Sequence, residues 1–159
     1  MIIIPILLGL IDQLIKYLFQ QNQSWAYLHG SSVQFFLAYY ENHWAAFSLP
    51  IPSRPVAIFS GLIILWLFYK LLDVRPRLRF WVMFIIIGAL SNLLDRVRLG
   101  FVVDYMGVGV SVVGTVITIA RTAHFNLGDI MIVLGILGWC RAFTAKHEMD
   151  TRLDGMENG

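Results

Sequence analysis

Two aspartates stand beside one of the most apolar runs of the chain. Asp95 and Asp104 lie within residues 88–106, and Asp129 opens the next apolar run. Placing a charged group near a bilayer costs free energy, so such residues usually serve a function. If two of these carboxylates converge within a few Å they cannot both ionise easily, and they share one proton. Such a pair can serve as general base towards water and general acid towards a peptide bond.

The polar residues around these aspartates recur at helical spacing. Asn92 and Asp95 are three residues apart, as are Asn126 and Asp129, so each pair projects from one face of a helix. Gly100 is expected to end the first of these helices, and the FVVDY around the remaining aspartate has the makeup of a short strand. We therefore expect polar pairs at the ends of two apolar helices, with one aspartate on a strand between them.

Each charged residue in an apolar run also has a structural interpretation. Carboxylates inside a membrane can join helices by hydrogen bonds, and Asp95 beside Arg96 can form a simple ion pair. Asp12 and Lys16 are four residues apart and are expected to pair on one helix face as a support for the structure. The residues alone leave both a protease and a proton-coupled carrier open.

The composition is that of a membrane protein. Of the 159 residues, 58% are hydrophobic and 14% are charged, which does not describe a soluble globule. The predicted fold is mainly α, with four transmembrane helices at about 2–19, 55–72, 79–95 and 125–143, each near the roughly 20 residues that a bilayer requires. Residues 1–10 lack the charged start and cleavage site of a signal peptide, so we expect a retained span. We expect one domain over 1–145 and a polar, frayed cytoplasmic tail over 146–159.

The loops indicate an orientation. Four spans put both termini on one side, and the short loop over residues 70–79 carries a basic cluster, which predicts that this side is cytoplasmic. The aromatic-rich residues 20–54 are expected to form a small sheet, including the strand VQFFLAYY, at the outer leaflet. Asn42 there is expected either to point inward or to form a turn. Residues 107–123 are rich in glycine and predict a hairpin or flap over the outer surface.

Several kinds of site are excluded by what the sequence lacks. A net charge of +2, with no basic run that has aromatic residues interleaved, argues against nucleic acid. Cys140 has no partner for a disulfide or for zinc, and His43 has no second ligand at metal spacing. The sequence has no HExxH, no serine or cysteine with a plausible histidine partner, and no phosphate-binding glycine loop. We therefore expect neither a metal nor a cofactor.

Five blocks of the sequence resemble, in order, the motifs of the bacterial lipoprotein signal peptidases, or signal peptidase II. IDQLIK is similar to D-Q-x-x-K, and ENHWAAFS to N-T-G-A-A-F-S. GALSNLLDR is similar to G-A-x-G-N-x-x-D-R, FVVDY to V-V-D-F, and HFNLGD to F-N-x-A-D. Together the blocks run from Asp12 to the last apolar segment, and five in order with compatible gaps make the resemblance specific.

The resemblance implies a fold, a reaction and a set of roles. The family has four transmembrane helices, cytoplasmic termini and an aspartyl dyad near the outer leaflet of the bacterial inner membrane. It cleaves the signal peptide of diacylglyceryl-modified prolipoproteins on the N-terminal side of the lipidated cysteine, and the peptide antibiotic globomycin inhibits it. Partners would thus be prolipoproteins, membrane lipid and globomycin-type inhibitors. By motif, the catalytic residues would be Asp104 and Asp129, the residues that hold substrate, lipid or dyad would be Asn42, Asn92, Arg96 and Asn126, and the supporting residues would be Asp12, Lys16 and Asp95.

Several positions depart from the motifs without removing a catalytic group. Trp44 and Ser91 stand where the family has glycine, and Gly128 stands where it has alanine. Trp44 is expected to add bulk near the cleft and Gly128 to add backbone freedom beside Asp129.

Two alternatives to the peptidase stay open: a small proton-coupled transporter, and an inactive homologue that only binds lipoproteins. The second span is almost bare of polar residues, which argues against a transport path.

Overall fold

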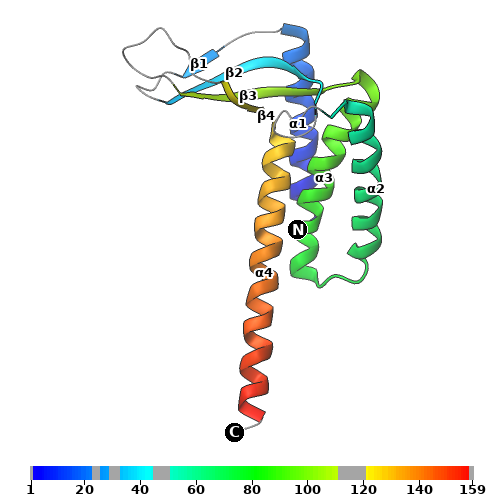
Figure 1. Ribbon diagram of the computed structural model, residues 1–159, viewed down its shortest axis with the longest axis vertical. Coiled ribbons are helices and arrows are strands. Elements are labelled where there is room, and N and C mark those ends of the chain that lie inside the picture. The colour runs from blue at the N-terminus through cyan, green and yellow to red at the C-terminus, as the bar shows by residue number, and fades with distance from the viewer. Residues whose placement is uncertain (1, 23–25, 29–32, 45–50, 111–120, 158–159) are drawn as a thin grey trace.

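The computed structural model contains four long helices and one antiparallel sheet (Figure 1). It describes residues 2–22, 26–28, 33–44, 51–110 and 121–157. The elements in chain order are α1 (Ile3–Asn22), β1 (Ala26–Leu28), β2 (Val33–Asn42), α2 (Ser53–Leu71), α3 (Pro76–Leu99), β3 (Val102–Val110), β4 (Arg121–Phe125) and α4 (Leu127–Glu157).

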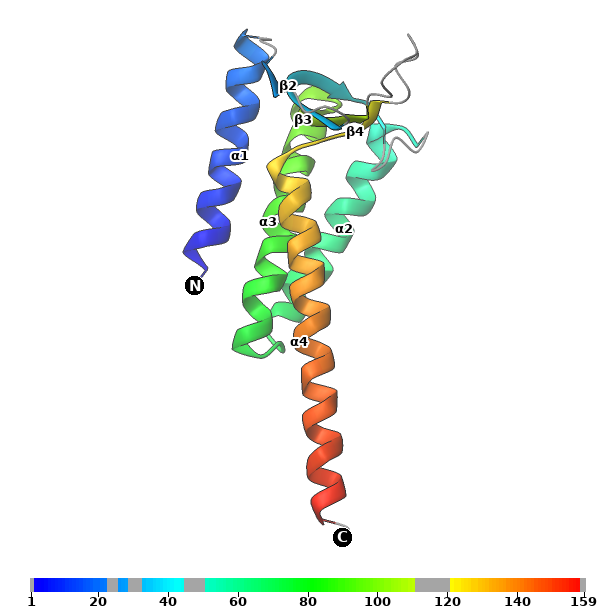
Figure 2. The same ribbon diagram turned by 90° about the vertical axis from the view of Figure 1, so that its left-hand side faces the viewer.

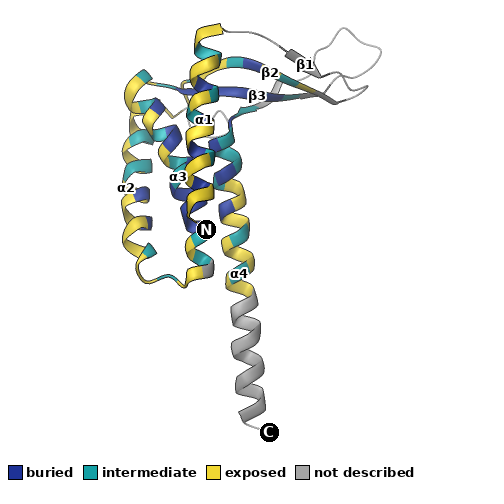
Figure 3. Ribbon diagram, turned by 180° about the vertical axis from the view of Figure 1, so that it is seen from behind, coloured by how far each residue is buried: buried dark blue, intermediate teal, exposed yellow. Residues whose placement is uncertain are grey.

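All four helices are long and apolar enough to cross a membrane, which agrees with the predicted fold class. Where burial is described, their outward faces are largely exposed (Figure 3), as expected of side chains that meet lipid rather than a protein core. The candidate spans cover 3–22, 53–71, 78–99 and 127–144, so the third span runs four residues further than predicted.

The expectation of a frayed tail after residue 145 was wrong, because α4 continues to Glu157. It extends well past the ends of the other helices (Figure 1). The segment AKHEMDTRLDGME contains no proline and many good helix formers, so nothing in it stops a helix that the apolar part has already nucleated.

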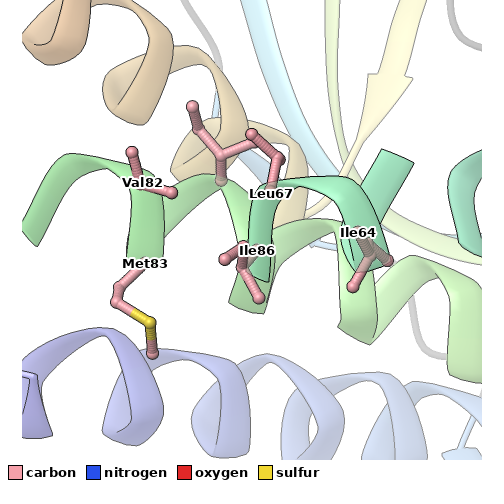
Figure 4. Packing of buried hydrophobic residues seen from close by; sticks show 6 residues of the cluster. Ile64, Leu67, Val82, Met83 and Ile86 are labelled. Atoms are coloured by element: carbon pink, nitrogen blue, oxygen red, sulfur yellow. The ribbon is translucent and has the colours of Figure 1, made fainter. Parts of the chain in front are cut away.

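Helix α3 is the centre of the bundle and packs against the other three helices (Figure 2). Ile64 and Leu67 of α2 form a core with four side chains of α3, namely Val82, Met83, Ile85 and Ile86 (Figure 4). On its α4 side, Gly88 leaves no room for a side chain, because a Cβ there would collide with the carbonyl oxygen of Gly128. Small residues therefore bring α3 and α4 close together.

The four strands form a sheet in the order β1-β2-β3-β4 at one end of the bundle (Figure 1). Gly100, in the left-handed conformation with φ 85°, ends α3 and turns the chain into β3, so the predicted helix end and strand are both confirmed. β3 and β4 pair as an antiparallel hairpin, while the part of the predicted flap over 111–120 lies outside the described residues. Asp104 lies on β3, which pairs with β4, and β4 leads directly into α4. The sheet therefore places Asp104 near the start of α4.

Candidate active site

Asp104 and Asp129 meet at the junction of β4 and α4, where Asn126 contacts both. The Asn126 side-chain amide donates to Asp104 Oδ1 at 2.7 Å, and its backbone N–H donates to Asp129 Oδ2 at 3.1 Å. The Asn126 side-chain oxygen accepts from the backbone N–H of Asp129 at 3.0 Å, which makes Asn126 the N-cap of α4. The predicted Asn-x-x-Asp pair thus exists, and it also reaches the aspartate on β3.

Asn42, at the end of β2, holds the other oxygen of Asp104. Its Nδ2 donates to Asp104 Oδ2 at 3.0 Å, while its Oδ1 accepts from the backbone N–H of Trp44 at 3.1 Å. Both of the expected roles therefore occur together, because the turn fixes the amide so that its NH2 group faces inward. Nearby, His43 is exposed and lies 3.3 Å from the carboxylate of Glu41.

Lys16 of α1 is buried against α3. Its Nζ lies 2.9 Å from Asp12 Oδ2 and 3.0 Å from Asp95 Oδ2, and it donates to Asn92 Oδ1 at 2.8 Å. Asn92 Nδ2 in turn donates to Asp129 Oδ1 at 2.8 Å. The predicted pair of Asp12 and Lys16 is confirmed, and the ammonium group is joined to the dyad through one amide.

The ion pair considered between Asp95 and Arg96 is absent from the described residues. Asp95 pairs with Lys16 across the helix interface and also accepts from the backbone N–H of Val103 at 3.2 Å. Arg96 makes one long hydrogen bond, from Nη1 to the carbonyl oxygen of Asn92 at 3.4 Å, and its buried Nε has no partner. Neighbouring residues on a helix project about 100° apart, so adjacency in sequence did not predict the true partner.

Three further side chains complete the polar cluster and were assigned no role from the sequence. Ser91 Oγ donates to Asp12 Oδ2 at 2.5 Å, Gln13 Nε2 donates to Ser91 Oγ at 2.8 Å, and Tyr105 OH donates to Asp12 Oδ1 at 2.8 Å. Gln13 matches the glutamine of D-Q-x-x-K, which was the signal available for it, whereas Tyr105 stands where V-V-D-F has phenylalanine, so the motif gave no sign of its hydroxyl. Ser91 drew notice only as a departure from glycine, and its hydroxyl turns out to join α3 to α1.

Burial and, after it, the negative charge of Asp129 raise the pKa of Asp104 to about 7, although the donors Asn42 and Asn126 and the charge of Lys16 lower it. A buried carboxyl beside a second carboxylate keeps a proton near neutral pH. The arrangement therefore suits a pair that holds one proton, as acid–base chemistry on water and a peptide requires. Among the described residues, no group of three His, Cys, Asp or Glu gathers at metal-binding distances.

Gly128 allows a close approach rather than an unusual backbone conformation. A Cβ there would lie 3.0 Å from Asn126 Oδ1, 3.0 Å from the carbonyl oxygen of Gly88 and 3.3 Å from Asn92 Oδ1. The expectation of added backbone freedom is corrected accordingly, since only Gly100 has a positive φ among the described glycines. Trp44 is partly exposed and contributes its backbone N–H to the turn at Asn42.

The chain is similar to known proteins in sequence and in fold. The model of the family "Signal peptidase (SPase) II" matches residues 4–144. A lipoprotein signal peptidase of Moorella thermoacetica is 35% identical over 147 residues, covering 87% of this chain and 89% of that protein. One from Clostridioides difficile is 37% identical over 109 residues, covering 67% of this chain and 68% of that protein. A bacterial membrane enzyme solved by the in meso method at 2.3 Å is similar in fold, with a TM-score of 0.74, 20% identity, and coverage of 92% of this chain and 88% of that one.

Proposed function

This chain belongs to the signal peptidase II family, and from that premise we propose that Asp104 and Asp129 are the catalytic pair of a lipoprotein signal peptidase. Membership makes the protein a protease of the membrane that acts on prolipoproteins. The observation that carries the residue assignment is Asn126, whose one side chain and backbone N–H contact both carboxylates.

The surroundings of the two aspartates divide the roles between them. Asp104, with its pKa raised to about 7, is the acid that carries the proton. Asp129 lies in the first turn of α4, where the positive end of the helix dipole favours a carboxylate, and it is the base. Asp129 removes a proton from water, the resulting hydroxide attacks the peptide carbonyl carbon, and Asp104 donates its proton to the carbonyl oxygen. As this intermediate collapses and the C–N bond breaks, Asp129 gives the leaving nitrogen the proton that it took from water, and Asp104 regains its proton from the hydroxyl that becomes the new carboxyl group.

The three asparagines orient the dyad, and Arg96 remains for the substrate. Asn42, Asn92 and Asn126 all donate to carboxylate oxygens. Arg96 has no carboxylate within ion-pair distance among the described residues, and its buried Nε is unpaired. A guanidinium with free donors suits carbonyl oxygens of the peptide or of the ester-linked lipid on its cysteine.

The arrangement of the elements supports a location in the bacterial inner membrane. The start of α1, the end of α4 and the α2–α3 loop all lie away from the sheet (Figure 1). That loop and its flanks carry Lys70, Arg75, Arg77 and Arg79, which by the positive-inside rule face the cytoplasm. The sheet and dyad then lie at the outer leaflet, where the lipidated cysteine, surrounding lipid and a globomycin-type inhibitor reach them.

The test is cleavage of a diacylglyceryl-modified prolipoprotein in detergent, followed by gel shift, with the parent and the Asp104→Asn and Asp129→Asn variants. Asp73→Asn, an exposed carboxylate in the α2–α3 loop, is the matched control. We expect cleavage by the parent and the control, complete loss in both dyad variants, and inhibition of the parent by globomycin. Near-normal cleavage by either folded dyad variant would refute the assignment, and a folded parent inert on several lipidated precursors would favour a binding homologue.

A further inference from the structure

The hydroxyl group of Tyr105, on β3, forms hydrogen bonds with both α1 and α4. It donates to Asp12 Oδ1 on α1 at 2.8 Å and accepts from the backbone N–H of Leu127 on α4 at 3.0 Å. The Tyr105 ring is buried and stacks on Phe19, with ring centroids 5.6 Å apart and an interplanar angle of 19°. Burial raises the pKa of Tyr105, and the charge of Asp12 raises it further, so the hydroxyl keeps the proton that it donates.

The acceptor on the α1 side is held rigidly. Asp12 is fully buried, and its other oxygen, Oδ2, accepts from Ser91 at 2.5 Å and lies 2.9 Å from the ammonium group of Lys16. Three elements other than α4 therefore converge on one carboxylate: α1 carries it, α3 supplies Ser91 and β3 supplies Tyr105. The hydroxyl of Tyr105 consequently has a fixed position from which to bind α4.

The bond on the α4 side falls at a sensitive place. Leu127 is the first residue of α4, and the first N–H groups of a helix have no partner within the helix. The preceding residue, Asn126, is the one whose amide and backbone contact both aspartates. The Tyr105 hydroxyl thus binds the peptide that joins Asn126 to Leu127, while Tyr105 itself directly follows Asp104 in β3.

We propose that Tyr105 is a positioning residue of the reaction: its hydroxyl holds the Asn126–Leu127 peptide at the distance from β3 that lets Asn126 contact both carboxylates. The inference rests on the proposed function of the dyad and adds a residue to it. Tyr105 does not touch the reacting atoms, so it acts on turnover and not on substrate affinity. A displacement of about 1 Å in a catalytic geometry can cost on the order of 100-fold in rate.

A purely structural role would give a different set of results. Loss of the hydroxyl leaves two buried polar groups unpaired, which lowers stability whatever the groups do in catalysis. Positioning additionally predicts a lower kcat at unchanged KM, together with a shift of the basic limb of the pH profile. Asn126 is one of the donors that lower the pKa of Asp104, so a looser Asn126 moves that limb to higher pH. The charged groups facing Asp104 are Asp129 on α4, Lys16 on α1, and Arg96 on α3, which attracts it, and none of these is altered.

The experiment removes each partner of the bond in turn. Tyr105→Phe deletes the hydroxyl and keeps the ring that stacks on Phe19. Leu127→Pro deletes the N–H, and proline is favoured at the first position of a helix, with Leu127→Ala as the control for its side chain. Tyr69→Phe removes the hydroxyl of an exposed tyrosine on α2 and is the control for Tyr105→Phe. The activity of Asp104→Asn tests the proposed dyad separately.

We expect Tyr105→Phe and Leu127→Pro each to lower kcat about ten-fold, to leave KM within about two-fold and to move the basic limb upward. The double variant should be no slower than the slower single variant, because both changes break one bond. Normal kcat and pH profile in folded Tyr105→Phe would overturn the inference, as would losses that multiply in the double variant. If Tyr105→Phe does not fold, normal turnover in Leu127→Pro overturns it. Activity in Asp104→Asn would instead overturn the proposed function.

Discussion

The buried ammonium group of Lys16 gives the sharpest test of the cluster beneath the dyad. We consider Lys16→Met, which keeps most of the volume of the side chain and removes its charge. Lys16 and Asp12 are 2% and 0% exposed, and Asp95 is similarly buried. The variant therefore leaves two carboxylates in a region without solvent and without their shared cation.

The magnitude follows from the contacts that are lost. Removing one partner of a buried ion pair costs about 3–5 kcal/mol, because the remaining charge is uncompensated. Here one cation serves two carboxylates at 2.9 Å and 3.0 Å, so we expect a loss at the upper end of that range. The double variant Lys16→Met with Asp95→Asn removes one of the two uncompensated negative charges. Relative to Lys16→Met alone, it should regain about 0.5–3 kcal/mol of the free energy of unfolding, the usual size of coupling between residues in contact.

The free energy of unfolding can be measured by SDS titration in mixed micelles, followed by tryptophan fluorescence. Lys70→Met is the control, because Lys70 is exposed and, within the described residues, has no ion pair; a surface change of this kind is worth about 0.5 kcal/mol or less. A folded Lys16→Met protein within about 1 kcal/mol of the parent, or a double variant that recovers nothing, would refute the account of the cluster as a charge-balanced support.

Three other predictions use different parts of the structure. Stability should fall as pH rises from about 4 to about 7, because the folded chain keeps on Asp104, whose pKa is about 7, a proton that the unfolded chain has released. Asp104→Asn should remove most of this slope in the same SDS titration, and an unchanged slope would contradict the assignment. Gly88→Ala should cost about 1–3 kcal/mol because its Cβ would meet the carbonyl oxygen of Gly128. Gly61→Ala, whose nearest neighbour is 3.9 Å away, should cost far less, and equal losses would count against the close α3–α4 contact. Arg96→Met should raise KM for the lipidated precursor with kcat nearly unchanged, whereas a fall in kcat alone would place Arg96 with the dyad.

Local features of the site could be predicted from the sequence because they depend on near neighbours. The pairing of Asp12 with Lys16, the end of α3 at Gly100 and the strand around Asp104 each follow from spacing or residue type within a few positions. The pair of Asn126 and Asp129 was found in the same way. Such features need no knowledge of how the helices pack.

Contacts between distant segments could not be predicted in that way. Ser91 bonds to Asp12 across 79 positions, and Tyr105 bonds to Asp12 across 93. The true partner of Asp95 is Lys16 on another helix, although Arg96 stands next to it in sequence. Hydroxyls are common in loops and helices alike, so nothing in residue type alone marks Ser91 or Tyr105 as members of a buried network. Packing decides these contacts, and packing depends on the whole bundle.

The orientation of three amide groups shows how the cluster prepares the dyad. An asparagine amide has an oxygen that accepts and a nitrogen that donates, so a donor fixed on the oxygen turns the nitrogen the other way. In each case the oxygen accepts from a donor and the nitrogen contacts a carboxylate of the proposed dyad. The oxygen donors are the Trp44 backbone N–H for Asn42, the Asp129 backbone N–H for Asn126 and the Lys16 ammonium group for Asn92.

With the backbone N–H of Asn126, these amides give each of the four carboxylate oxygens of Asp104 and Asp129 one donor. The donors are present before any substrate arrives, so little reorganisation is needed as charge moves between the two aspartates during the reaction. Lys16 therefore does more than neutralise Asp12 and Asp95. By holding the oxygen of Asn92, it sets the direction of the hydrogen bond to the proposed base, and the buried support and the dyad form one connected network.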